Sequence, residues 1–110
     1  MTEPEHWAGF SVPAMRHEAH FGDRIIRCFS ARPSSFHAMF EEALASHADR
    51  RAVLFNGASL SYRELDREVG RIAAGLASHG VERGDRVMMF IGNRPEFVSV
   101  LLAIQRLLII

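Results

Sequence analysis

The chain has 110 residues, of which 48% are hydrophobic and 24% are charged, a composition typical of one small globular domain and unlike that of disordered chains. Thirteen basic residues balance thirteen acidic residues, so no net charge favours binding to nucleic acid or to an anionic membrane surface. Every basic residue is arginine, and the absence of lysine excludes a Schiff base, a lysine general base and a lysine-containing phosphate loop from this chain.

Residues 1–33 show no sustained helical or alternating pattern and are interrupted by prolines and glycines. We expect a poorly regular leader with a weakly helical stretch at Ala14–Phe21 and a stretch at Arg24–Phe29 that docks on a neighbour. The start of the chain lacks the basic and apolar regions of a signal peptide, which predicts a cytoplasmic protein. Cys28, the single cysteine, cannot form an intrachain disulfide and is expected to be a small buried hydrophobe.

Residues 34–110 carry regular patterns and are expected to form an incomplete α/β unit. Ser34 or Ser35 can cap a helix, because apolar residues follow at positions i, i+3, i+4, i+7 and i+8 of one helical face. These residues are Phe36, Met39, Phe40, Ala43 and Leu44. The helix is expected to end near His47, where the helix dipole favours a proton.

A hairpin and a second helix are predicted next. Ala52–Phe55 has the composition of a strand, and Asn56-Gly57 tolerates the positive φ angles of a tight turn before a return strand. Ser61 and Glu64 form an S-x-x-E capping box, which fixes a helix start at Ser61.

This second helix is predicted over residues 62–79, with Gly80 in the left-handed conformation that ends a helix. Gly70 and Gly75 lie inside it and each weaken its intrinsic propensity by about 1 kcal/mol relative to alanine. We therefore expect these two glycines to permit close approach of another backbone.

The apolar run Val87–Ile91 has the length of a strand that is covered on both faces, which implies a parallel sheet surrounded by helices. Asn93 offers a cap for a helix predicted over residues 94–107, with Pro95 in its first turn. Ile109 and Ile110 resemble the first residues of a further strand. The order hairpin, helix, strand, helix predicts an α/β fold with right-handed crossovers.

Three stretches carry a resemblance to a known family. Residues 60–65 read Leu-Ser-Tyr-Arg-Glu-Leu and match the pattern Leu-(Thr/Ser)-Tyr-x-Glu-Leu. Residues 84–87 read Gly-Asp-Arg-Val and are followed by Asn93 and Pro95, and Phe21–Phe29 matches a leader sequence. Over residues 21–107 the chain resembles the N-terminal part of the adenylate-forming (AMP-binding) enzymes, which include acyl-CoA synthetases, peptide-synthetase adenylation domains and luciferases, and its leader looks most like that of fatty-acid–CoA ligases.

The resemblance implies a partial parallel-sheet subdomain of the family's large N-terminal domain. It also implies the family reaction, in which a carboxylate attacks the α-phosphate of ATP to give an acyl-adenylate and coenzyme A then displaces AMP. The family's phosphate loop, its adenine and magnesium segments and its C-terminal lysine lie beyond the matched stretch. We therefore expect an N-terminal fragment of an ATP-dependent acid–CoA ligase that is inactive alone, with ATP, magnesium and coenzyme A implied only for the full-length enzyme. Leu108 stands where the family has glycine, which suggests a truncated reading frame.

No catalytic, cofactor-binding or metal-binding residue is assigned. His17 and His20 could share a metal ion if their segment were helical, but two ligands without a third are more typical of exposed histidines. Asn93 and Arg94 follow the predicted strand at the sheet edge where ligands tend to bind, although helix capping accounts for Asn93.

Two other functions stay open. A free-standing interaction module would associate with itself through the unfinished sheet edge and the apolar end of the chain at residues 107–110. One half of a split enzyme would instead combine with a second chain that supplies the phosphate loop. A membrane span is not expected, because the apolar stretch at residues 97–110 is shorter than the roughly 20 residues that a span requires.

Overall fold

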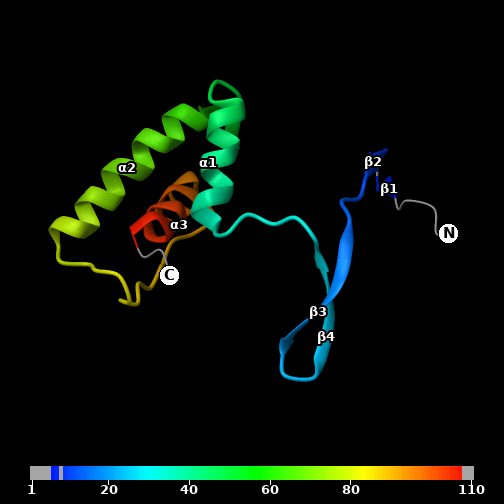
Figure 1. Ribbon diagram of the computed structural model, residues 1–110. Coiled ribbons are helices and arrows are strands. Elements are labelled where there is room, and N and C mark those ends of the chain that lie inside the picture. The colour runs from blue at the N-terminus through cyan, green and yellow to red at the C-terminus, as the bar shows by residue number, and fades with distance from the viewer. Residues whose placement is uncertain (1–5, 8, 108–110) are drawn as a thin grey trace. The chain divides into compact units, whose positions relative to one another are not determined.

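The structure is a computed structural model that describes residues 6–7 and 9–107 (Figure 1). It divides into two compact units, Met1–Pro33 and Ser34–Ile110, here called the first and the second unit. The further strand expected at Ile109 and Ile110 lies outside the described residues. None of the described helices combines the length and the apolar character needed to cross a membrane.

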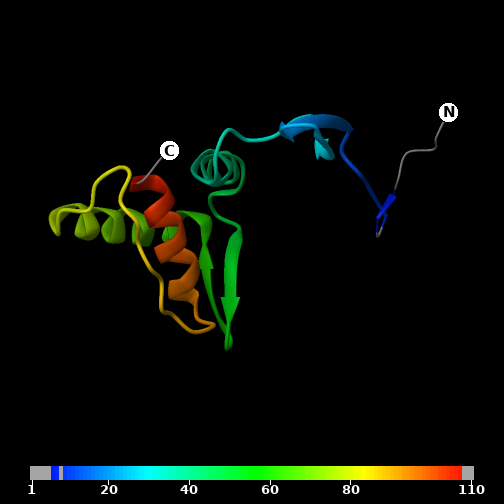
Figure 2. The same cartoon turned by 90° about the horizontal axis from the view of Figure 1, so that it is seen from below.

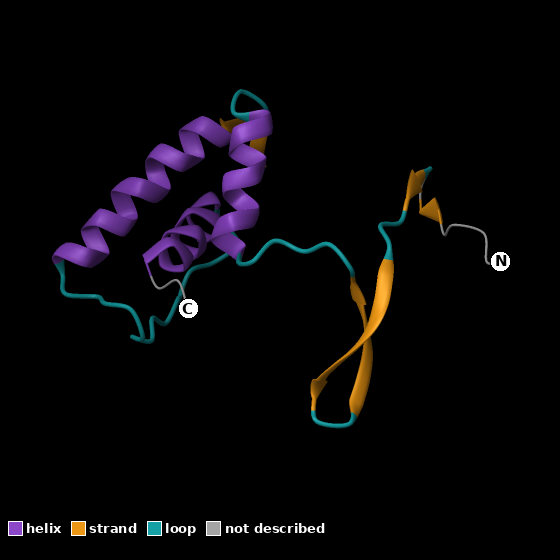
Figure 3. Ribbon diagram, viewed as in Figure 1, coloured by secondary structure: helices purple, strands orange, loops and turns teal. Residues whose placement is uncertain are grey.

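The described residues of the first unit form two antiparallel strand pairs (Figure 3). Strand β1 (His6–Trp7) pairs with β2 (Phe10–Ser11), and β3 (Met15–Phe21) pairs with β4 (Arg24–Phe29). The weakly helical stretch expected at Ala14–Phe21 is therefore wrong. Its helical pattern was weak, and cross-strand pairing with β4 supplies the backbone hydrogen bonds that a helix would otherwise make.

The second unit is a mixed α/β arrangement, as the sequence predicts. Its elements in chain order are α1 (Phe36–His47), β5 (Arg51–Phe55), β6 (Ala58–Ser61), α2 (Tyr62–Ser78) and α3 (Pro95–Leu107). The three helices contact one another, and the β5–β6 hairpin lies against α2 and α3 (Figures 1 and 2).

Helix α1 begins where the sequence predicts a cap. The Ser35 hydroxyl oxygen accepts a hydrogen bond from the backbone N–H of Ala38 at 3.0 Å, and the helix ends at His47. Its apolar face is only partly covered, because Phe40 is buried whereas Phe36 and Met39 are 59% and 47% exposed. The second unit therefore presents apolar side chains of α1 to its surroundings.

The hairpin and the start of α2 agree with the sequence. Asn56 and Gly57 have φ angles of 48° and 78° in the turn between β5 and β6. The Ser61 hydroxyl oxygen accepts from the Glu64 N–H at 3.1 Å, and the Glu64 carboxylate accepts from the Ser61 N–H at 2.8 Å. This is the predicted capping box, and it satisfies two backbone donors that the first turn of a helix leaves without partners.

The expected role of the two glycines inside α2 is not found. A Cβ atom at Gly70 would lie 3.6 Å from a terminal nitrogen of the Arg106 side chain, which is an ordinary contact distance, and one at Gly75 would meet nothing within 4 Å. What covers Gly70 is the end of a flexible side chain rather than a backbone. Gly80, just after α2, has the predicted left-handed conformation with φ 88°.

The core of the second unit lies where the three helices meet. Its buried residues are Phe40, Leu65, Val69, Ala73 and Ala103. The ring of Phe40 on α1 lies 6.2 Å from that of Tyr62 on α2, centroid to centroid. Ser99 on α3 is fully buried, and its hydroxyl donates to the Glu96 carbonyl at 3.3 Å, so this buried polar group is satisfied within its own helix.

The segment Val87–Ile91 departs from the sequence prediction. It forms no strand and runs as a loop between α2 and α3 (Figure 3). Side-chain exposure alternates along it: Val87, Met89 and Ile91 are partly buried, whereas Met88 and Phe90 are 90% and 99% exposed. Burial on both faces requires a neighbouring strand and a second covering layer, and the described residues of the second unit supply neither.

Candidate functional site

The residues of the two family-like motifs stabilise the fold of the second unit by capping a helix, closing a turn or packing in the core. Ser61 and Glu64 cap α2, and Leu65 is 2% exposed in the core. In the second motif Gly84 has φ 94°, and the Asp85 carboxylate accepts from the Glu82 backbone N–H at 2.8 Å to close the turn. Each of these polar groups already has a partner that accounts for its presence in the motif.

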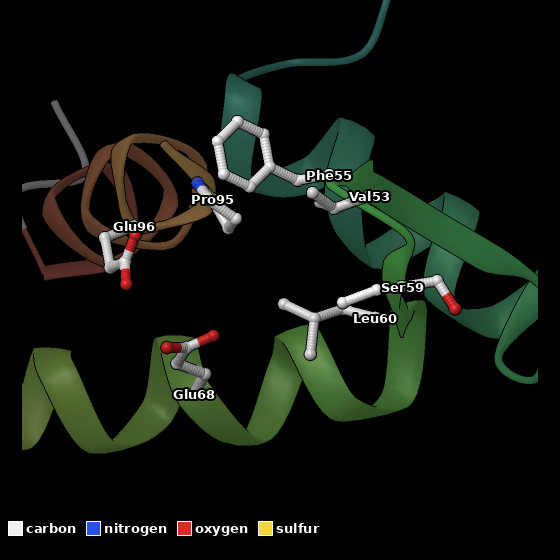
Figure 4. A pocket seen from close by; sticks show the side chains of 8 residues that line it. Val53, Phe55, Ser59, Leu60, Glu68, Pro95 and Glu96 are labelled. Carbon is white, nitrogen blue, oxygen red and sulfur yellow. The ribbon is translucent and has the colours of Figure 1, made fainter. Parts of the chain in front are cut away.

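A small pocket of about 250 Å³ lies between the hairpin, α2 and α3 (Figure 4). Its lining residues are Val53, Phe55, Ala58, Ser59, Leu60, Glu68, Pro95 and Glu96. Hairpin side chains form one side of the pocket, and the carboxylates of Glu68 on α2 and Glu96 on α3 lie on the other (Figure 4).

The chemistry of this pocket does not suit ATP. Its lining contains two carboxylates and no arginine or histidine, so it would repel the phosphate groups of a nucleotide. Phosphoryl-transfer sites instead place cations and backbone N–H groups around phosphate oxygens. The pocket is better described as an apolar hollow with an acidic side.

Asn93 and Arg94 lie in the bend before α3, and both are exposed. The Arg94 side chain approaches Glu96 at 3.5 Å, and the backbone carbonyl of Arg94 accepts from the Phe97 N–H at 3.0 Å. Neither residue lines the pocket described above. Because Val87–Ile91 forms no strand, the sheet edge at which Asn93 and Arg94 were expected to lie is not formed by the described residues.

A charged cluster occupies one face of the β3–β4 hairpin in the first unit. The Glu18 carboxylate accepts from Arg32 at 2.8 and 3.2 Å, from Arg16 at 2.5 Å and from the ring nitrogen Nε2 of His20. Arg32, followed by Arg16 and His20, holds the pKa of Glu18 at about 2, below its ordinary value of 4.5. The thiol of Cys28 lies close to the same carboxylate and imidazole.

The sequence did not lead us to this cluster, because we paired His20 with His17 rather than with Glu18 and Cys28. His17 and His20 share a side only in a helix, whereas in β3 the side chain of His17 lies opposite Arg27, on the other face from its neighbour Glu18. An alternating pattern Arg16, Glu18, His20 is present in the sequence and could have indicated the shared strand face.

Comparison with known proteins gives a family match. Residues 40–110 match the family model described as AMP-binding enzyme. That stretch begins in α1 and includes the hairpin, α2 and α3, so the match covers nearly all of the second unit.

Individual relatives match over similar stretches. The chain is 32% identical over 96 residues to surfactin synthase subunit 3 of Bacillus subtilis, which covers 87% of this chain and 6% of the relative. It is 36% identical over 73 residues to 2,3-dihydroxybenzoate-AMP ligase of Bacillus subtilis, covering 66% and 14%. It is 39% identical over 69 residues to acetyl-coenzyme A synthetase of Nitrosomonas europaea, covering 58% and 10%. The chain thus spans a small part of each relative's length.

Proposed function

The chain belongs to the AMP-binding enzyme family, and we propose that it forms the N-terminal structural portion of an ATP-dependent ligase that activates a carboxylic acid as its adenylate. In the reaction that the family resemblance implies, the acid attacks the α-phosphate of ATP, pyrophosphate leaves, and coenzyme A then displaces AMP. We assign the chain to the acid–CoA ligase branch and to the cytoplasm. The similarity to an acetyl-coenzyme A synthetase supports this branch.

One observation carries the structural role: the family motif residues hydrogen-bond to backbone groups or pack in the core. Ser61, Glu64 and Asp85 each bond to a backbone N–H, and Leu65 packs in the core. The chain also contains no lysine, so any lysine that adenylate formation requires must come from other residues of the enzyme. ATP, magnesium and coenzyme A would therefore be bound by the complete enzyme and not by this portion alone.

The exposed apolar residues support the same role. Met88 and Phe90 of the loop before α3 are almost fully exposed, and Phe36 and Met39 of α1 are about half exposed. Large apolar side chains that are this exposed are typical of a surface that another polypeptide covers. We infer that the rest of the ligase covers them and gives Val87–Ile91 the strand neighbours that it lacks.

The same exposed residues also favour a second candidate, a free-standing interaction module that associates with itself. Analytical ultracentrifugation separates the two proposals, because a discrete, well-folded dimer favours the module. A chain that forms no discrete dimer, and stays monomeric or aggregates without its complement, favours the structural portion.

Mixing tests the structural role directly. We would combine the purified chain with a polypeptide that carries the family's phosphate loop and C-terminal domain, such as the product of an adjacent reading frame. Acid-dependent exchange of pyrophosphate into ATP is expected only in the mixture. Absence of exchange with every acid tried, despite a stable complex, would contradict a role in the ligase.

A further inference from the structure

Three different metal-binding side chains meet on one face of the β3–β4 hairpin. One carboxylate oxygen of Glu18, one ring nitrogen of His20 and the sulfur of Cys28 all lie within 4.8 Å of one another. Glu18 and His20 are two residues apart on β3, and Cys28 lies on β4 opposite Arg16. Two hydrogen-bonded strands therefore hold the three groups together, rather than one flexible loop.

The donor set suits zinc. Zn²⁺ binds thiolate sulfur, imidazole nitrogen and carboxylate oxygen, usually with four ligands in a tetrahedral arrangement. Two ligand atoms that each lie about 2.0–2.3 Å from one metal ion are at most about 4.6 Å apart. The three groups here lie within 4.8 Å of one another, close to that limit. Three protein ligands would leave the fourth position to water. Glu18 and Cys28 are partly buried, whereas His20 is exposed, so an ion can reach the cluster from solvent.

Arg16 and Arg32 together bind both oxygens of the Glu18 carboxylate, and the remaining contact is with His20. Nε2 of His20 already faces one oxygen of the carboxylate, and a metal ion would replace that direct contact by bonding to both groups. Arg16 and Arg32 would remain as partners of the carboxylate and hold it in place, as hydrogen-bonding groups behind metal ligands commonly do. They also place positive charge beside the ion. The carboxylate and the thiolate together carry two negative charges, which equal the charge of the metal, and the two guanidinium groups leave the whole cluster positively charged.

We propose that Glu18, His20 and Cys28 form a zinc-binding site on the first unit, separate from the ligase role of the second unit. Binding forms Zn–S, Zn–N and Zn–O bonds, displaces water from the hydrated ion and releases the thiol proton of Cys28 to solvent. The proton on Nε2 of His20 also leaves to solvent, and the neutral ring keeps its proton on Nδ1. No electron is transferred. Since the chain contains a single cysteine, every metal–thiolate signal reports on this position.

Cobalt titration of the full chain tests the proposal. Co²⁺ takes the place of Zn²⁺, and its bond to a thiolate produces a charge-transfer absorption band. We expect a band that saturates at one equivalent of Co²⁺ and disappears when Zn²⁺ is added. Cys28→Ser should abolish the band, and His20→Ala and Glu18→Gln should each weaken cobalt binding about tenfold or more.

His17→Ala is the matched control, because His17 lies on the opposite face of β3 and should leave cobalt binding unchanged. A measurement on the unaltered chain guards against variants that fold poorly: one equivalent of Zn²⁺ should protect Cys28 from iodoacetamide, and a chelator should remove the protection. No cobalt band and no protection by zinc would overturn the proposal. So would cobalt binding that His20→Ala and Glu18→Gln leave unchanged.

Discussion

Arg106 on α3 donates a hydrogen bond to the Asp66 carboxylate on α2 at 2.6 Å, which joins two helices across 40 residues of sequence. The same guanidinium approaches the Glu41 carboxylate on α1 at 3.8 Å. Arg106, which lies on α3, therefore forms ion pairs with both α1 and α2. Its side chain is only 23% exposed. The ion pair therefore lies beside the core rather than on an open surface, where such pairs contribute little.

Asp66→Ala should destabilise the second unit by about 1–2 kcal/mol, because it leaves a largely covered guanidinium with Glu41 as its remaining acidic neighbour. Urea unfolding followed by circular dichroism would measure the change. Asp49→Ala is the matched control: Asp49 pairs with Arg63, but its side chain is 87% exposed, so a loss of about 0.5 kcal/mol or less is expected. Equal losses in the two variants would contradict the role given to Arg106.

Ser61→Ala should cost about 1 kcal/mol of stability, because the Glu64 N–H loses its hydroxyl acceptor. Ser59→Ala, two residues earlier and exposed, removes the same hydroxyl group without removing a cap and should change the urea midpoint very little. If the two midpoints shift alike, the capping box does not stabilise α2 as described.

The features that could be predicted from sequence are those that neighbouring residues determine. The Ser61 cap, the Asn56-Gly57 turn and the end of α2 before Gly80 depend on local backbone chemistry and were confirmed. The strand at Val87–Ile91 was not, because an apolar run becomes a buried strand only beside a neighbouring strand. For the same reason the proximity of Cys28 to Glu18 could not be foreseen: it depends on the register of two strands, which places Cys28 opposite Arg16.

The Glu18 carboxyl group should titrate at about pH 2 in the metal-free chain, below its ordinary pKa of 4.5, because Arg32 donates to its charged form. A pKa lowered on folding means that this carboxylate stabilises the hairpin above about pH 4.5 and that the contribution disappears as pH falls towards 2. Carboxyl NMR shifts, recorded with a chelator present, measure the midpoint.

Arg32→Gln should move the Glu18 midpoint upward, towards 4.5. Arg24→Gln, at the turn end of the same hairpin, should leave the midpoint near its original value. A wild-type midpoint close to 4.5, or one that does not respond to Arg32→Gln, would show that the cluster does not hold the carboxylate as described.

Phe90→Asp should leave the stability of the isolated chain unchanged within about 0.5 kcal/mol, since the ring is 99% exposed. The same change should abolish association with the complementary part of the ligase, because the proposed interface would then bury an unpaired charge. Arg83→Asp introduces a carboxylate at another exposed position, in the turn after α2, and should preserve association. Co-purification of the two polypeptides measures this, and undiminished association of Phe90→Asp would place the interface elsewhere.

The most direct test of the structural role is ATP–pyrophosphate exchange by the purified 110-residue chain alone, with Mg²⁺ and a set of acids that includes acetate, long-chain fatty acids and aromatic acids. Phosphoryl transfer depends on cations and N–H donors placed around the phosphates, and the pocket between the hairpin, α2 and α3 offers carboxylates instead. Exchange no greater than that of a buffer blank is predicted for every acid. Acid-dependent exchange above that blank, eliminated by removing Mg²⁺, would contradict the account and assign catalysis to this chain.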